Sequence, residues 1–248
     1  MIWREVIGRY KGSFMGLFWS LVTPLLMLLV YTFFFSVVFQ SRWPEATGSK
    51  TAFAIILFSG LMIFNFFAEC VSRAPTIVIG NTNYVKKIIF PLELLPIVVM
   101  GAAAFHLLVS FIVWLGFYLY FMGLPSPSVL YIIPILVPLV LWICGLMWIV
   151  SSLGVYLRDV NQFVATVIPA MMLLSPVFYP ATTLPEEIRP LFNVNPLTFI
   201  IEQTRAVLVF GHGLDWATWS RQLLGSFLFA WIGLTWFQKT RKGFADVL

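Results

Sequence analysis

Charged residues divide this chain into long uncharged stretches. The uncharged and mainly apolar runs are Gly12–Ser41, Thr51–Ala68, Leu94–Leu157, Val160–Pro185 and Gln222–Gln238. The third run is interrupted at 123–128 by Gly-Leu-Pro-Ser-Pro-Ser, which predicts two apolar helices joined by a short hairpin loop. Because about 20 apolar residues cross a bilayer, we expect about six transmembrane helices. Their expected positions are near 20–41, 52–73, 96–122, 129–152, 162–180 and 222–239.

This pattern predicts an all-α integral membrane protein with a single transmembrane domain over 1–248. Lone strands are excluded as membrane spans, because their backbone groups would be unpaired in lipid. Composition agrees, since 60% of the residues are hydrophobic and 10% are charged, whereas soluble domains carry roughly 25% charged residues.

The first 19 residues differ from the spans because their polar residues share one face. At 100° per residue, an arc about 160° wide holds the apolar side chains. They are Ile2, Trp3, Val6, Ile7, Tyr10, Phe14, Leu17 and Phe18, while Arg4, Glu5, Arg9 and Lys11 lie opposite. We expect an amphipathic helix over 1–19 that lies in the membrane interface. The alternative is an ordinary N-terminal extension of the first span.

The distribution of Lys and Arg predicts the orientation. The side that holds the N-terminus carries ten of these residues and the opposite side carries five. Since positive charge favours the cytoplasmic side, we expect both termini in the cytoplasm. The net charge of +5 suits membrane lipids with anionic headgroups rather than nucleic acid, because the basic residues are scattered near span ends.

The region between the last two predicted spans is rich in proline and acidic residues. It contains the uncharged runs Pro190–Ile201 and Ala206–Leu214, both too short to span a bilayer. Irregular backbone at membrane depth requires contact with protein or a wet cavity. We therefore expect re-entrant segments that form a gate on the outer side.

The chain lacks the sequence patterns of a self-contained enzyme. No Gly-x-x-x-x-Gly-Lys-Ser/Thr nucleotide-binding loop occurs, so any ATP must be bound by a partner. No bound cofactor or metal is expected, because the only histidines, His106 and His212, lie far apart in the chain. Cys70 and Cys144 are interpreted as small buried hydrophobic residues.

Two ionisable residues fall inside predicted spans. Glu69 is a functional candidate by its position, but Arg73 follows four residues later, and a structural Glu–Arg pair at that spacing is favoured over a role in transport. His106 is interpreted as a neutral, hydrogen-bonded interior residue, with a proton relay as the alternative.

Two further features have open interpretations. The inner loop from Arg73 to Glu93 is either a short helix that meets a partner or a solvated linker. The many aromatic residues, 25 Phe, 10 Trp and 8 Tyr, suit lipid contact and interfacial belts. Some of them could instead line a path along which a sugar polymer slides.

Several segments, in order along the chain, resemble the type-2 ABC exporter permeases of the polysaccharide export family. These segments are RYKGSFMGLFWSLVTPLLMLLVYTFFFSVVF at 9–39, LGVYLRDVNQF at 153–163, SPVFYP at 175–180 and NPLTFIIEQTRAVL at 195–208. The resemblance is nearest to the O-antigen export permeases, followed by the teichoic acid export permeases. One departure is that only eight residues precede the Arg9 motif, which predicts a short interface helix.

The resemblance implies a homodimer in the cell inner membrane that encloses a channel for lipid-linked polysaccharide. It also implies a separate nucleotide-binding ATPase subunit, which holds ATP and Mg and docks under the cytoplasmic loops. The residues implied in ATPase coupling are Arg4, Arg9, Asn83, Tyr84, Lys86, Lys87, Arg158 and Asp159. Those implied in the gate or channel are Phe178, Tyr179, Pro180, Glu186, Glu187 and Arg189.

Three alternative functions are also compatible with these sequence features. The first is a permease of the same fold for teichoic acid, capsule or a small hydrophobic cargo. The second is a polytopic membrane enzyme acting on lipid-linked sugars, for which Glu186, Glu187 and Arg189 are the candidate group. The third is a secondary carrier that works without an ATPase.

Overall fold

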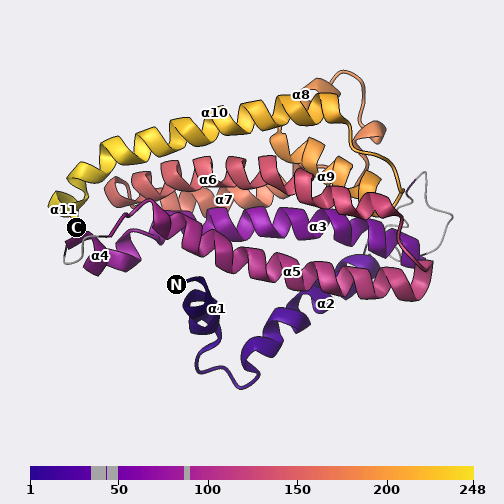
Figure 1. The fold of residues 1–248 in the computed structure, drawn as a ribbon, viewed down its shortest axis with the longest axis horizontal. Helices are drawn as coiled ribbons and strands as arrows, with labels where there is room; N and C mark the ends of the chain where they lie inside the picture. Colours follow the sequence, from indigo (N-terminus) through magenta and orange to yellow (C-terminus); the bar gives the residue numbers. More distant parts are fainter. Residues whose placement is uncertain (35–42, 44–49, 87–89) are drawn as a thin grey trace.

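The computed structural model describes residues 1–34, 43, 50–86 and 90–248, and every regular element in these ranges is a helix (Figure 1). The α-helices are α1 (Ile2–Tyr10), α2 (Trp19–Thr32), α3 (Lys50–Arg73), α4 (Thr82–Lys86), α5 (Leu94–Met122), α6 (Ile132–Tyr156), α7 (Val160–Leu173), α8 (Arg189–Val194), α9 (Pro196–Leu208), α10 (Trp216–Thr240) and α11 (Phe244–Val247). The short 3-10 helices are η1 (Gly16–Phe18), η3 (Ala74–Thr76), η4 (Ile79–Asn81), η5 (Pro127–Tyr131), η6 (Ala181–Thr183) and η7 (Arg241–Gly243).

The long helices run side by side along the long axis of the molecule, and α3 lies at their centre (Figure 1). In the most apolar part of α3, 78% of the residues are buried, against 28% in the corresponding parts of α5 and α6. The outer helices expose large apolar side chains such as Leu108, Ile112 and Ile133. An apolar exterior of this kind suits lipid rather than water.

Three helices of the described chain are long and apolar enough to cross a membrane, as judged by length and composition. They are Thr51–Thr76, Leu94–Met122 and Pro127–Tyr156. Two shorter apolar helices, Gly16–Thr32 and Val160–Leu173, fall below that length. The 25-residue helix α10 covers the sixth predicted span but is not among the three. The end of the first predicted span, 35–41, lies outside the described residues.

The fifth predicted span, 162–180, is longer than the helix found there. Helix α7 ends at Leu173, and the chain continues through turns to Pro180. Ser175 precedes Pro176, and the residue before a proline disfavours the helical conformation. The uncharged run Val160–Pro185 therefore extends beyond the end of the helix, and the predicted end at residue 180 is wrong.

The interface helix predicted over 1–19 is also shorter than expected. Helix α1 ends at Tyr10, and the chain turns before η1 and α2 begin. Gly12 and Gly16 have positive φ values of 86° and 50°, a conformation that glycine adopts without steric cost. These two glycines let the chain reverse, so α1 is a separate element from α2 (Figure 1).

Helices α6 and α10 form the most extensive helix pair, and glycine permits their close approach. A Cβ atom added to Gly233 of α10 would lie 2.4 Å from the carbonyl oxygen of Gly145 on α6. Small residues at such crossings let two backbones pack directly, as is common between helices in membranes.

Candidate functional site

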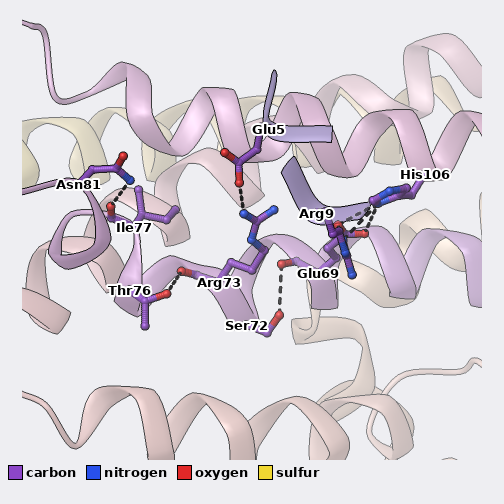
Figure 2. A network of polar contacts seen from close by, with 9 residues as sticks. All are labelled: Glu5, Arg9, Glu69, Ser72, Arg73, Thr76, Ile77, Asn81 and His106. Carbon is purple, nitrogen blue, oxygen red and sulfur yellow. Dashed lines mark hydrogen bonds and ion pairs between the residues drawn. The ribbon is translucent and has the colours of Figure 1, made fainter. Parts of the chain in front are cut away.

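Two ion pairs join the polar face of α1 to the C-terminal part of α3 (Figure 2). Arg9 pairs with Glu69, and Glu5 pairs with Arg73, so the two pairs lie about one helical turn apart on both helices. We call Glu5, Arg9, Tyr10, Glu69, Arg73 and His106 the α1 anchor. Because two pairs of opposite charges join α1 to α3, they fix the position of α1 relative to the bundle.

The anchor includes a third helix, α5, which contributes His106. Its Nδ1 atom lies 2.9 Å and 3.0 Å from the two carboxylate oxygens of Glu69. Its Nε2 atom lies 2.9 Å from the hydroxyl oxygen of Tyr10. Burial is the main cause that raises the pKa of Tyr10, so its phenol stays protonated at neutral pH and can donate to Nε2. The imidazole of His106 therefore links Tyr10 of α1 to Glu69 of α3 through its two ring nitrogens.

The expected local pair between Glu69 and Arg73 is wrong. Each residue binds a residue of α1 instead, some 60 to 70 positions earlier in the chain. The spacing of four residues allows a local pair, but such pairs stabilise a helix by only about 0.2–0.5 kcal/mol. No local pattern in the sequence indicates that α1 supplies an acidic and a basic residue opposite Arg73 and Glu69.

Apolar contacts support the anchor on the opposite face of α1. Val6 is buried, and Ile2 lies against Gly101 of α5, where an added Cβ atom would come within 2.5 Å of its Cδ1. The Trp3 and Phe105 rings meet edge to face with centroids 6.1 Å apart. Part of the predicted apolar arc of α1 therefore packs on protein.

The predicted coupling residues of α1 and of the loop between α3 and α5 lie next to the anchor. Arg4 and Tyr84 line the same cavity of about 360 Å³ between α1, α4 and α5, with Glu5 and Asn81 also in its wall. Tyr84 is half-buried against the Phe90 ring at 5.1 Å, whereas Asn83 is exposed. Lys86 ends α4, and Lys87 lies outside the described residues.

The remaining predicted coupling residues, Arg158 and Asp159, are exposed in the turn between α6 and α7. This turn lies near the loop between α3 and α5, because a Cβ atom added to Gly154 of α6 would come within 2.2 Å of the Pro75 carbonyl oxygen. The C-terminal helix α11 lies at the same end of the molecule and contacts α4 and α6 (Figure 1). We call this the α11 end, and the opposite end the α8 end.

At the α8 end, a buried arginine organises the chain after α7. The side chain of Arg205 on α9 is 1% exposed and donates to the carbonyl oxygens of Pro176 and Val177. Its guanidinium carbon lies 4.4 Å from the centre of the Trp43 ring, a cation–π contact. Gly60 of α3 provides the space, since an added Cβ atom there would lie 2.6 Å from Arg205 Nη2.

The acidic partner of Arg205 also binds this segment. Glu202 Oε1 accepts a hydrogen bond from Arg205 Nη1 at 3.2 Å and another from the backbone N–H of Ala181 at 3.2 Å. Asn195, which caps α9, donates to Ser175 Oγ at 2.9 Å. The segment from Ser175 to Ala181 is therefore held to α9 at both of its ends.

The predicted gate residues occupy two different environments. Phe178 and Tyr179 are half-buried and meet the rings of Tyr31 and Phe192 at 5.6 Å and 6.3 Å, and Pro180 is buried. Glu186 and Glu187 are exposed. Arg189 donates to the carbonyl oxygens of Thr182 and Leu184 at 3.1 Å and 3.0 Å. Its role in the structure is to close the loop that carries the two glutamates.

Arg205 was missed as a site residue because charge counting placed it among the basic residues of the outer side. An available signal was its position between the uncharged residues Thr204 and Ala206, within an otherwise amphipathic run. No cluster of His, Cys, Asp and Glu that could hold a metal occurs in the part of the chain that the structure describes.

Comparison with known proteins matches residues 1–209 to the family described as ABC-2 type transporter. An O-antigen export system permease protein RfbA of Klebsiella pneumoniae is 29% identical over 246 residues, covering 99% of this chain and 92% of that protein. A second protein of that name from the same organism is 28% identical over the same shares. A protein of that name from Myxococcus xanthus is 26% identical over 251 residues, covering 99% and 93%. The similarity thus runs through both ends described above.

Proposed function

Since the chain belongs to the ABC-2 type transporter family, we propose that it is the permease of an ATP-driven exporter that moves lipid-linked polysaccharide of the O-antigen class across the inner membrane. Proteins of this family are membrane subunits of transporters, and ATP hydrolysis takes place on a separate subunit. The observation that carries the cargo assignment is the similarity over 99% of the chain to permeases named for O-antigen export.

In this proposal the chain crosses the membrane about six times, with the α11 end in the cytoplasm and the α8 end outside. The excess of Lys and Arg on the side of the N-terminus supports this orientation. Helix α7 is shorter than a full span, so the irregular segment that follows Leu173 completes this crossing at the α8 end.

The partner ATPase docks at the α11 end, where it binds ATP and Mg²⁺. The exposed residues Asn83, Arg158 and Asp159 offer it polar contacts from two neighbouring loops. Its movement reaches the bundle through α1, because the anchor links α1 to α3 and α5 by charge and hydrogen bonds. A rigid link of this kind transmits a displacement that a flexible tail would absorb.

Two copies of the chain enclose the path of the polymer, and the segment from Ser175 to Arg189 forms its outer gate. Support comes from the many carbonyl and carboxylate bonds that hold this irregular segment in place. Aromatic residues there, Phe178 and Tyr179, present faces on which sugar rings can slide. Teichoic acid is the second candidate cargo, which the resemblance of the motifs also favours.

Deletion of the gene tests this function. We expect long polysaccharide to disappear from the cell surface while lipid-linked polymer accumulates inside the cell. Accumulation inside would separate an export defect from a defect in synthesis. Unchanged surface polysaccharide would contradict the assigned cargo and leave a permease for another substrate.

A further inference from the structure

A polar cavity of about 560 Å³ lies at the α8 end, between α9 and the first turns of α10. Its wall includes Asn193, Phe199, Glu202, Gln203, Asp215 and Gln222. We call it the α9–α10 cavity. Its volume lies in the range of about 300–1,000 Å³ that is typical of ligand pockets.

The lining of this cavity differs in kind from that of the other large hollow at this end. The hollow between α2, α3 and α5, of about 500 Å³, is lined by apolar side chains such as Leu25, Leu29 and Phe117, which suit hydrocarbon chains. The α9–α10 cavity instead presents three amides, two carboxylates, the guanidinium of Arg221 and one aromatic ring. Amides and carboxylates pair with the hydroxyl groups of sugars, and an aromatic ring packs on their C–H faces.

Several of these groups are held in position before any ligand binds. Glu202 is fixed by Arg205 and the Ala181 N–H, and Gln203 Oε1 accepts from the Asp215 N–H at 3.2 Å. Asp215 caps α10 by accepting from the Ala217 and Thr218 N–H groups, each at 3.1 Å. Hydrogen bonds from Thr218 are the main cause that lowers the pKa of Asp215, so its carboxylate is ionised at neutral pH.

Two amides in the wall have unused hydrogen-bonding capacity. Neither Asn193 nor Gln222 has a side-chain hydrogen bond to another residue within the described ranges. Each amide offers two donor hydrogens and one acceptor oxygen to a ligand. The wall also holds one cation, Arg221, which donates to the Thr218 hydroxyl at 2.9 Å. The two carboxylates outnumber this cation, so the cavity suits an uncharged, hydroxyl-rich ligand better than a phosphate.

We propose that the α9–α10 cavity is a saccharide subsite, which holds a short stretch of hydroxyl-rich polymer at the outer side of the membrane. The inference rests on the proposed function, because a polysaccharide cargo provides the ligand. Glu202 connects the subsite to the segment from Ser175 to Ala181, so a bound sugar lies beside the proposed gate. The polymer there is either a chain in transit or a finished chain that returns from outside.

Binding measurements test the subsite directly. The full chain, assembled with its ATPase subunit in lipid nanodiscs, is titrated with polysaccharide from the strain that carries the gene, after release from its lipid by mild acid. The double variant Asn193→Ala/Gln222→Ala should bind about tenfold more weakly, because it loses several hydrogen bonds. The matched control is Gln238→Ala, at the other end of α10 and exposed. Equal affinity of all three proteins, or no binding by the unaltered protein, would overturn the subsite.

A photo-crosslinking residue in place of Gln222 distinguishes the two sources of polymer in cells. Crosslinks that vanish when the ATPase is inactivated identify a chain in transit. Crosslinks that form on adding the delipidated polymer from outside identify a finished chain, and either result supports the subsite. Failure of both kinds of crosslink in cells whose surface polysaccharide is normal would reject the subsite while leaving the proposed function intact.

Discussion

Glu69 on α3 binds Arg9 on α1, although Arg73 lies only one helical turn away on its own helix. The carboxylate is 16% exposed, and it also accepts from His106 on α5, so three helices converge on one group (Figure 2). A buried carboxylate is stable only when it is paired and hydrogen-bonded. In this position Glu69 ties the N-terminal helix to the centre of the bundle.

Replacement of Glu69 by alanine should destabilise the protein by about 1–3 kcal/mol, because Arg9 and His106 lose a shared partner in a poorly hydrated position. Glu69→Gln keeps the hydrogen bond to His106 and should cost less. The measurement is the midpoint of thermal unfolding of the detergent-purified protein. Equal midpoints for the alanine, glutamine and unaltered proteins would show that the anchor does not contribute to stability.

The pair between Glu5 and Arg73 permits a charge-swap experiment. Glu5→Arg or Arg73→Glu alone should weaken the attachment of α1, since each places like charges together, and the double variant should restore it. Both side chains are about one-third exposed, at 36% and 33%, so we expect a modest coupling of roughly 0.2–1 kcal/mol.

Distance measurements between spin labels on α1 and α5 report the attachment of α1 in these variants. Lys11→Glu, an exposed position just after α1, is the matched control for a change of charge without a partner. A double variant that remains as mobile as either single variant would contradict the pairing.

The anchor also shows what the sequence could and could not predict. The long helices near 52–73, 96–122 and 129–152 were located closely, because uninterrupted apolar runs and the turn at 123–128 are local signals. The partners of Glu69 and Arg73 depend on how α1 folds back, and the turn at Gly12 that sets this path has no periodic signal. Polar pairing between distant segments therefore required the tertiary structure.

Arg205, at the α8 end, is a second polar residue whose partners the sequence did not reveal. From the sequence it counts only as a basic residue of the side opposite the N-terminus. In the structure its guanidinium is enclosed by two carbonyl oxygens, Glu202 and the Trp43 ring. A buried arginine is stable when such groups satisfy its donors, and sequence spacing alone does not reveal carbonyl partners. The apolar runs on either side of Glu202 were expected as separate pieces, whereas α9 passes through Glu202 and Arg205 without a break.

Substitution of Arg205 should loosen the segment from Ser175 to Ala181. Arg205→Met removes both bonds to the Pro176 and Val177 carbonyls and leaves them unpaired, whereas Arg205→Lys retains the charge but cannot reproduce the planar fork. We expect a loss of about 2–5 kcal/mol for methionine and less for lysine.

Labelling of a cysteine placed at Tyr179 measures this loosening, with Cys70 and Cys144 buried in the background. The labelling rate should rise from the parent to lysine to methionine at position 205. Arg221→Met, at an exposed position of α10, controls for the loss of a positive charge at this end. Identical rates in all variants would contradict the holding role of Arg205.

The crossing of α6 and α10 predicts opposite outcomes for two glycines of the same helix. Gly233→Ala would push a Cβ atom to 2.4 Å from the Gly145 carbonyl oxygen, so the helices must separate, at a cost of about 1–3 kcal/mol. At Gly225 the nearest atom to an added Cβ is in the Trp142 ring at 3.7 Å, an ordinary contact. Gly225→Ala should therefore be neutral or slightly stabilising, because alanine favours the helix. Thermal unfolding of the two variants side by side checks the crossing, and equal midpoints would contradict it.

Export powered by a separate ATPase is tested by measuring polymer transport in liposomes that contain the purified chain, its ATPase partner and lipid-linked polysaccharide. We expect polymer to reach the far side only when ATP, Mg²⁺ and both proteins are present, and an ion gradient alone to have no effect. Transport by the chain without its partner, or transport driven by an ion gradient in the absence of ATP, would contradict this expectation.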